Sequence, residues 1–296
     1  GGLWDYDTRI LSRYEPKIDG QPPRYVSGGI IGEERWAARL RVPRAGGTPQ
    51  GPGLPEDALE LFIMRLVGRG MAERLLVINH GMLVVETELS IGLGADFRDV
   101  QEIGRDRMQT GDTETIWSAE RSWLVLRYRA EHHGRRLERA LRVRVGRSDG
   151  AAAYRDGELC FPLRLPAQGR WTAAICYDSW VDGEWRRPLA ESPGAETERD
   201  RVRAAWQGTR ARVEASDPSV TRVFERAAND LFALRNWEYD EQVDAWHTKA
   251  GAPTYSGIFG RDSLTAAWQG SLLGPEMLRG TLPVIARTQA ERDSAW

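Results

Sequence analysis

Apolar residues up to about residue 190 recur at every second position or come in short runs. This period is typical of β-strands, whose side chains point alternately to the two faces of a sheet. The segments with this pattern are residues 59–68, 73–92, 122–131, 137–145 and 170–178. Tight turns are indicated by Asn79-His80-Gly81 between two strands and by a second hairpin at residues 131–136. Many short strands with close turns predict an antiparallel β-sandwich.

Glycine and proline mark two interruptions of the strand pattern. Residues 41–58 are rich in both and are expected to form an exposed loop inside the sandwich. Residues 186–198 precede a change of the apolar period from two residues to about 3.6, which is the period of an α-helix. The chain is therefore predicted to contain two domains, a β-sandwich over residues 1–192 and a helical domain over residues 197–296.

Helices are predicted throughout the second domain. Residues 195–215 have a helical composition, and a second helix follows Asp217, a good N-cap, with Pro218 at its first position. The apolar face of this second helix is predicted to hold Val220, Val223, Phe224, Ala227, Leu231 and Leu234. One more helix is predicted to start near Asp262, and another to open with Pro275.

Composition narrows the possible partners. The 296 residues are 41% apolar and 28% charged, with a net charge of −2 and with both signs interleaved. No nucleic-acid partner is therefore expected. No apolar run approaches 18 residues and no signal segment is present, so we expect no membrane partner and a cytoplasmic location. The N-terminus lacks a methionine and residues 289–296 stop within a helical pattern, which suggests a piece of a longer chain.

Cysteine and histidine offer little special chemistry. Cys160 and Cys176 lie in strand-like runs and are expected to be buried free thiols. His80, His132 and His133 fall in predicted turns without the spacing of metal ligands, so no metal site is predicted. No nucleotide-binding motif is present, and we expect no cofactor.

Asp262 is the first candidate for catalysis. It follows Gly260 and Arg261 at a predicted helix start. A carboxylate at that place often caps free N–H groups and favours the helix dipole, so local evidence alone favours a structural role.

Aromatic residues surround this segment. The chain holds 12 tryptophans, and flat aromatic faces suit sugar rings. The aromatic candidates are Trp237, Tyr239, Trp246, Tyr255, Phe259 and Trp268. For Trp268, inside a helix, core packing is the better prediction. For Trp246 and Tyr255, on a Gly- and Pro-containing loop, core packing and sugar contact are both open. His247 could bond a sugar hydroxyl or lie at the surface.

Three segments resemble bacterial glycogen debranching enzymes of the amylo-α-1,6-glucosidase type. Residues 2–20 contain "DTRILS", similar to the opening of that family's β-sandwich domain, and residues 75–104 contain "ADF" followed by an acid and an apolar residue two positions on. Residues 251–289, with "GRDS", resemble the start of the family's (α/α)6 barrel. The resemblance implies an α+β multidomain chain, with an N-terminal antiparallel β-sandwich followed by the first helices of a truncated barrel.

The resemblance also implies glycoside hydrolysis with inversion at α-1,6 branch linkages of an α-glucan or oligosaccharide. Asp262 would be the proton donor, and Arg261 would contact sugar hydroxyls or Asp262 itself. The terminal glucose subsite would be lined by Trp246, Tyr255 and Phe259. The second carboxylate and most of the barrel would lie beyond residue 296, so residues 1–296 alone are expected to be inactive. The apolar side chains expected to be left exposed are Val223, Leu231, Leu264, Leu273 and Leu282.

Two alternatives fit the same sequence. The first is another six-hairpin glycosidase, acting on a glucoside or a rhamnoside. The second is a non-catalytic carbohydrate-binding protein, in which the sandwich binds glucan and the helices only support it. The oligomeric state is not predicted.

Overall fold

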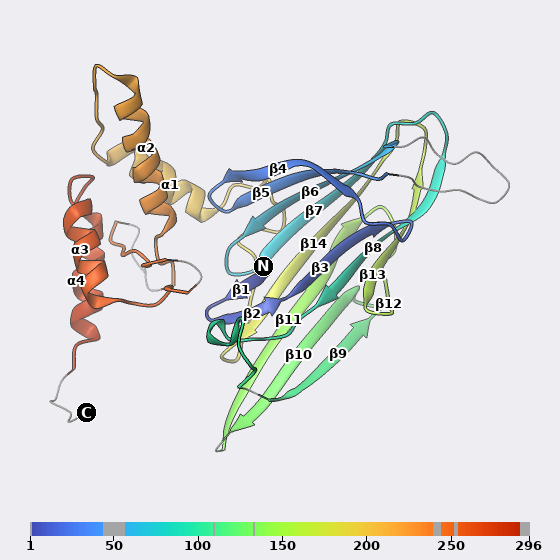
Figure 1. Ribbon diagram of the computed structural model, residues 1–296, viewed down its shortest axis with the longest axis horizontal. Coiled ribbons are helices and arrows are strands. Elements are labelled where there is room, and N and C mark those ends of the chain that lie inside the picture. Colours follow the sequence, from blue (N-terminus) through green and yellow to red (C-terminus); the bar gives the residue numbers. More distant parts are fainter. Residues whose placement is uncertain are drawn as a thin grey trace. The chain divides into compact units, whose positions relative to one another are not determined.

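The protein consists of two compact units, which Figure 1 shows in a computed structural model. The structure describes residues 2–43, 57–108, 110–132, 134–238, 244–251 and 254–290. Unit 1 spans Gly1–Ala195 and unit 2 spans Glu196–Trp296. Most of the expected loop at residues 41–58 and the aromatic candidate Tyr239 lie outside the described residues.

Unit 1 contains a large and a small antiparallel sheet. The large sheet has the order β4 (Arg24–Gly32), β5 (Arg35–Arg41), β6 (Leu59–Val67), β7 (Met71–Asn79), β14 (Arg170–Val181), β11 (Arg135–Ser148), β10 (Trp123–His132) and β9 (Asp112–Ser118), with β15 (Glu184–Arg186) on β14. The small sheet has the order β12 (Ala153–Arg155), β13 (Glu158–Leu165), β8 (Val85–Gly94) and β3 (Arg13–Ile18). A hairpin of β1 (Leu3–Asp5) and β2 (Thr8–Leu11) precedes them. The predicted antiparallel β-sandwich is confirmed.

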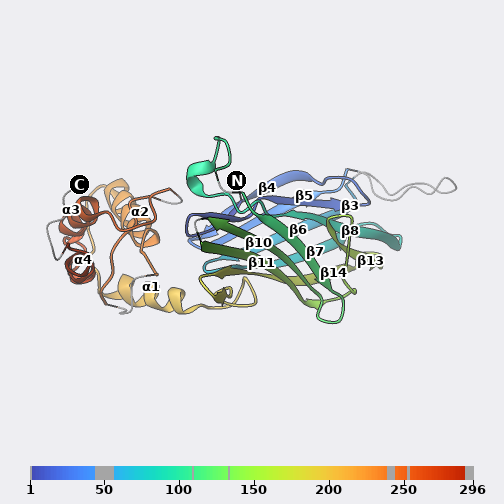
Figure 2. The ribbon, with the colours of Figure 1, turned by 90° about the horizontal axis from the view of Figure 1, so that it is seen from below.

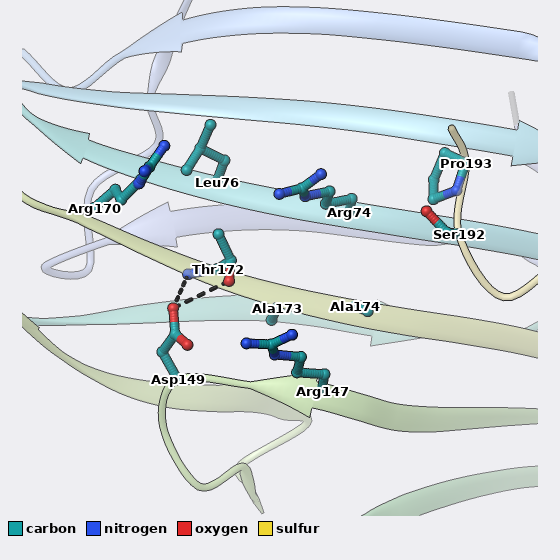
Figure 3. Close-up of a pocket in the computed structure, with 10 residues that line it drawn as sticks. All are labelled: Arg74, Leu76, Arg147, Asp149, Arg170, Thr172, Ala173, Ala174, Ser192 and Pro193. Carbon is teal, nitrogen blue, oxygen red and sulfur yellow. Dashed lines mark hydrogen bonds between the residues drawn. The ribbon is translucent and has the colours of Figure 1, made fainter. Parts of the chain in front are cut away.

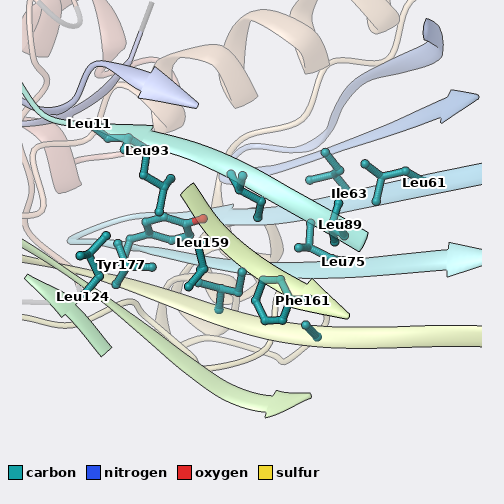
Figure 4. Packing of buried hydrophobic residues seen from close by; sticks show 14 of the residues in the cluster. Leu11, Leu61, Ile63, Leu75, Leu89, Leu93, Leu124, Leu159, Phe161 and Tyr177 are labelled. Carbon is teal, nitrogen blue, oxygen red and sulfur yellow. The ribbon is translucent and has the colours of Figure 1, made fainter. Parts of the chain in front are cut away.

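The two sheets bury their inner faces against each other. Leu75 on β7 and Ile63 on β6 meet Leu89 on β8 and Phe161 on β13 in one cluster (Figure 4). Arg74, which directly precedes Leu75 on β7, points to the opposite face of the sheet and is exposed, as the alternation of side chains along a strand requires. Each fully buried side chain of this size contributes about 1.5–3 kcal/mol, so this cluster is the main source of stability in unit 1.

Asn79-His80-Gly81 does not form the expected hairpin turn. It connects β7 in the large sheet to β8 in the small sheet, so the two strands do not pair. Buried Asn79 holds the turn, because its Nδ2 donates to the carbonyls of Leu83 at 2.8 Å and Pro166 at 2.9 Å. Its Oδ1 accepts from Gly81 N at 2.9 Å. The hydrogen bonds of the Asn79 side chain therefore hold this turn in place of the backbone hydrogen bonds that pair the strands of a hairpin.

A bidentate ion pair joins the two sandwich motifs of the sequence. Arg9 Nε donates to Asp96 Oδ1 at 3.0 Å, and Arg9 Nη2 bonds the second oxygen. Next to it, Phe97 adopts a positive φ of 49° and stacks on Tyr128, with ring centroids 5.8 Å apart. Asp99 then caps the short 3₁₀ helix η1 (Val100–Glu102), the teal coil near the N-terminus in Figure 2. Arg9 and Asp96, one from each of the two motifs, therefore hold the connection that follows β8 to the N-terminal hairpin.

A charged network lies inside the sandwich. Glu73 is fully buried and accepts from Arg65 Nε at 2.7 Å and from the Tyr177 hydroxyl at 2.8 Å. Burial and the neighbouring Glu73 charge raise the pKa of Tyr177 well above its ordinary value. The phenol therefore stays protonated and remains a donor to the buried carboxylate.

Unit 2 contains four helices within the described residues. They are α1 (Glu198–Thr209), α2 (Pro218–Ala233), α3 (Gly260–Gly270) and α4 (Glu276–Arg287). Asp217 caps α2 as predicted, since its side chain accepts from Ser219 N at 2.8 Å. Trp206, Phe232 and Trp246 form the aromatic centre of its core, with Trp206 and Phe232 rings stacked 4.8 Å apart.

The packed face of α2 centres on Ala228 and Phe232, while Val220, Val223 and Ala227 of its predicted apolar face are exposed. The prediction of core packing is wrong for one residue of α3. Trp268 is 71% exposed instead of lying in the core. The inward residues of α3 are the small Ser263, Ala267 and Gly270. Small inward residues let neighbouring helices approach closely, and the large side chains of α3 then fall on its outer side.

The expected exposure of apolar residues holds for three of the five positions. Val223 is 69%, Leu264 40% and Leu282 54% exposed. Leu231 and Leu273 instead pack, partly buried, against the core of unit 2, so the expectation is wrong for these two.

Cys160 and Cys176 are buried and free, as predicted. Burial raises the pKa of the Cys176 thiol to about 11, which makes it unreactive at neutral pH. None of the described helices is long and apolar enough to cross a membrane.

Glu73→Gln tests the buried network. The amide leaves the Arg65 charge without its carboxylate, so we expect the free energy of unfolding to fall by about 3 kcal/mol. Chemical denaturation measures it. Glu86→Gln is the control, because Glu86 is exposed and pairs with Arg164 at 3.4 Å, a contact worth less than about 1 kcal/mol. Equal effects of the two substitutions would refute the role of the network.

The Arg9–Asp96 pair predicts a dependence of stability on pH. Burial opposes ionisation of Asp96, but the hydrogen bond and charge of Arg9 hold the pKa of its carboxyl below the ordinary 3.8. A depressed folded-state pKa contributes stability that is present above pH 3.8 and is lost as pH falls through the folded value. As pH falls, the free energy of unfolding should therefore decrease less steeply in Asp96→Asn than in the wild type, which denaturation at a series of acidic pH values measures. An unchanged slope would contradict the pairing.

Candidate functional site

Asp262 is the third residue of α3, and its side chain is exposed. The N-cap of α3 is Phe259, and no side chain caps this helix. Within the described part of the chain, Asp262 has no hydrogen-bond or ion-pair partner, and the pairing considered with Arg261 is not formed. The carboxylate is therefore not used as a cap, and it is available to a ligand.

Trp246 and His247 do not reach the surface that Asp262 occupies. Trp246 is 1% exposed and packs edge-on against Trp206 at 5.9 Å and Phe232 at 5.5 Å between ring centroids. His247 is fully buried. The expectation that Trp246 stacks on a sugar, and that His247 bonds a sugar hydroxyl, is therefore corrected. Core packing, one of the two readings left open for Trp246, is the one observed.

Trp246 anchors the loop that leads to α3. Its backbone N donates to Glu276 O at 3.1 Å, and Asn236 N donates to His247 O at 2.9 Å. A Cβ added at Gly280 on α4 would lie 2.1 Å from the backbone N of Trp246. Only glycine allows this approach, so α4 and the loop are fixed to each other at this point.

Tyr255 and Phe259 are placed close to Asp262 along the chain. Their rings meet edge to face with centroids 5.8 Å apart, and Tyr255 is 56% exposed. A short turn holds Tyr255, since Gly251 N donates to Tyr255 O at 3.1 Å and Tyr255 N donates back at 2.6 Å. An exposed phenol, an exposed carboxylate and the exposed guanidinium of Arg261 thus lie within eight residues. This combination can bind hydroxyl groups and can donate a proton.

A second candidate site is a groove on the outer face of the large sheet in unit 1. Its volume is about 600 Å³. Its lining residues are Arg74, Leu76, Arg147, Asp149, Arg170, Thr172, Ala173, Ala174, Ser192 and Pro193 (Figure 3). Three of these ten residues are arginines, which is a basic lining in a chain of net charge −2.

Sequence reasoning missed the groove because its residues come from four separate segments. Because arginine is frequent throughout the chain, the position of a single arginine in the sequence does not indicate a binding site. The outward position of Arg74 and Leu76 can be predicted from the two-residue period of a strand. That Ala174 and Thr172 lie beside them can be known only from the pairing of β7 with β14.

Comparison of the sequence with known families gives one match. Residues 1–176, more than half of the chain, match the family described as the N-terminal domain of (some) glycogen debranching enzymes. The chain belongs to this family. Membership of this N-terminal domain family agrees with the resemblance of residues 2–20 and 75–104, and it covers the sandwich from β1 into β14. No curated protein matches the sequence.

Comparison with solved structures gives weaker similarities to this chain. One is named "Putative kojibiose phosphorylase from human microbiome", with a TM-score of 0.42 and 8% identity over 77% of this chain and 29% of that one. Another is heparinase III, with a TM-score of 0.29 and 11% identity over 58% of this chain and 28% of that one. The chain spans less than a third of the length of either protein.

Trp246→Ala tests the anchoring of the loop in unit 2. Removing a buried indole should lower the free energy of unfolding of unit 2 by about 3–5 kcal/mol. Urea unfolding followed by circular dichroism at helical wavelengths measures it. Tyr255→Ala removes a largely exposed ring and should cost less than about 1 kcal/mol. A small effect of Trp246→Ala would show that the loop is held elsewhere.

Proposed function

We propose that this chain is the N-terminal part of a glycoside hydrolase that cleaves α-1,6 branch linkages in glycogen-like α-glucans with inversion. The observation that carries the proposal is the membership of residues 1–176 in the family of debranching-enzyme N-terminal domains. The segment around Asp262, which follows this domain, supports it through its exposed carboxylate and the nearby aromatic rings. We place the enzyme in the cytoplasm, with an α-glucan or an oligosaccharide as its substrate.

Asp262 is proposed as the proton donor. An exposed carboxylate that neither caps its helix nor pairs with a described residue is free to protonate a glycosidic oxygen. In inversion, a second carboxylate about 6.5–9.5 Å away activates water on the opposite face of the sugar. We place this second group beyond residue 296, on a later helix. Tyr255, Phe259 and Arg261 would then contact the terminal glucose.

The exposed apolar side chains of unit 2 support an (α/α)6 barrel. Val223, Leu264 and Leu282 are joined in their exposure by Trp268 at 71% and Leu272 at 82%. Large exposed apolar patches are uncommon on complete soluble proteins. We propose that further helices of the barrel pack on these side chains.

A non-catalytic role in carbohydrate binding is the second candidate. A cavity of about 480 Å³ in unit 1 is lined by Tyr14, Trp36 and Arg65 among others. Trp36 is half-buried, and aromatic faces of this kind can stack on sugar rings. Glucan binding by residues 1–195 that persists while the full-length protein releases no glucose would favour this candidate.

Asp262→Asn in the full-length protein tests the proposed enzyme. Asparagine is nearly isosteric but cannot deliver a proton, so turnover of a branched dextrin should fall by about 10²–10⁴ while substrate binding is kept. Glucose release measures turnover, and calorimetry measures binding.

Asp217→Asn is the matched control for this experiment. Asp217 is also an aspartate at a helix start, but it caps α2 through Ser219 N, and asparagine caps nearly as well. Its turnover should stay within about twofold of the wild type. Full activity of Asp262→Asn would exclude Asp262 as the proton donor.

A further inference from the structure

Three guanidinium groups meet at the groove on the outer face of the large sheet without carboxylate partners. Arg74 lies on β7, Arg170 begins β14, and Arg147 lies near the end of β11. Within the described residues, none of the three has a hydrogen bond or an ion pair. Figure 3 shows Arg74 and Arg147 extending toward Thr172 from one side, with Arg170 on its other side.

Four arginines elsewhere on this face are paired with carboxylates. Strand register places Arg41, Glu60 and Arg170 in one cross-strand row, so these side chains share the outer face. On that face Arg39 bonds Glu60 at 2.9 Å and Arg41 bonds it at 3.1 Å.

The other two of these arginines share one carboxylate. Arg142 and Arg144 share Asp178 at 2.7 Å and 2.8 Å. Carboxylates thus pair with these four arginines, whereas the three arginines of the groove have no carboxylate partner among the described residues.

The floor of the groove combines small and polar groups. Asp149 Oδ2 accepts from Thr172 N at 2.8 Å and from Thr172 Oγ1 at 3.0 Å. Among the described residues Asp149 forms no ion pair with Arg147. Ala174 keeps the floor low between Arg74 and Arg147. Three arginines and one aspartate leave a formal charge of +2, which matches the charge of a phosphate monoester dianion.

We propose that this groove binds a phosphate group, either as inorganic phosphate or as the phosphate of a sugar phosphate. Guanidinium groups bind phosphate oxygens through paired N–H donors, and three of them can serve the three oxygens of a monoester. A volume of about 600 Å³ admits a phosphate together with one sugar ring. The site lies in unit 1 and does not depend on Asp262 or on the proposed hydrolysis.

Titration of the full-length protein by calorimetry with inorganic phosphate, glucose 1-phosphate and glucose 6-phosphate tests this site, with glucose as the uncharged control. The double variant Arg74→Gln/Arg170→Gln should weaken phosphate binding at least about tenfold, because it removes two of the three guanidinium groups that would form charge-assisted hydrogen bonds to the phosphate. Both side chains are exposed, so the fold should be kept, which circular dichroism checks. Arg164→Gln, an arginine of the small sheet outside the groove, should change the Kd by less than about twofold.

Tighter binding of a sugar phosphate than of inorganic phosphate supports the site and assigns a sugar phosphate as its ligand, whereas equal binding supports it with the free anion. Absence of saturable binding up to about 10 mM, far weaker than typical specific sites, would overturn it. So would equal binding by wild type and double variant, or binding of a single-stranded oligonucleotide through these arginines without binding of phosphate.

Discussion

Face-to-face burial of two antiparallel sheets is the interaction on which unit 1 depends. Leu75 and Phe161, on opposite sheets, belong to one continuous apolar core. Polar groups enter this core only with their partners, as Glu73 does with Arg65 and Tyr177. Because the apolar residues of the strands lie on the inner faces of the sheets, the outer face of the large sheet carries charged side chains, and the arginine-lined groove lies on that face. The Arg9–Asp96 pair adds a specific link between the N-terminal hairpin and the connection that follows β8.

In unit 2 the corresponding constraint is the aromatic centre around Trp246. Around this buried indole the loop is held to the segment after α2, where Asn236 N donates to His247 O, and to α4 at Gly280. Tyr255, Phe259 and Asp262 follow this loop in the chain. Trp246, which the resemblance placed at the glucose subsite, is therefore a core residue of unit 2.

Local features could be predicted from the sequence, and non-local ones could not. Strand alternation at residues 59–68 and the Asp217 cap depend on neighbouring residues, and both are observed. The hairpin expected at Asn79 is wrong because the strand partners of β7 and β8, which lie in different sheets, decide whether a hairpin forms. The exposure of Trp268 could not be predicted, since periodicity gives a helix face but does not show that small residues will be the packed ones. For Trp246 the sequence leaves core packing and sugar contact open, and only the tertiary structure shows the core packing. The bond between Arg9 and Asp96 and the groove at Arg74 both join segments far apart in the chain.

The central claim of the proposed function is that a carboxylate pair, with Asp262 as its acid, hydrolyses an α-linkage by direct attack of water. This claim fixes the stereochemistry of the product. Proton NMR of the glucose first released from a branched dextrin by the full-length protein, recorded before mutarotation, reads the anomeric configuration directly. Inversion at an α-linkage predicts β-glucose. Release of α-glucose would contradict it, because retention requires a covalent intermediate and a nucleophilic carboxylate close to the acid.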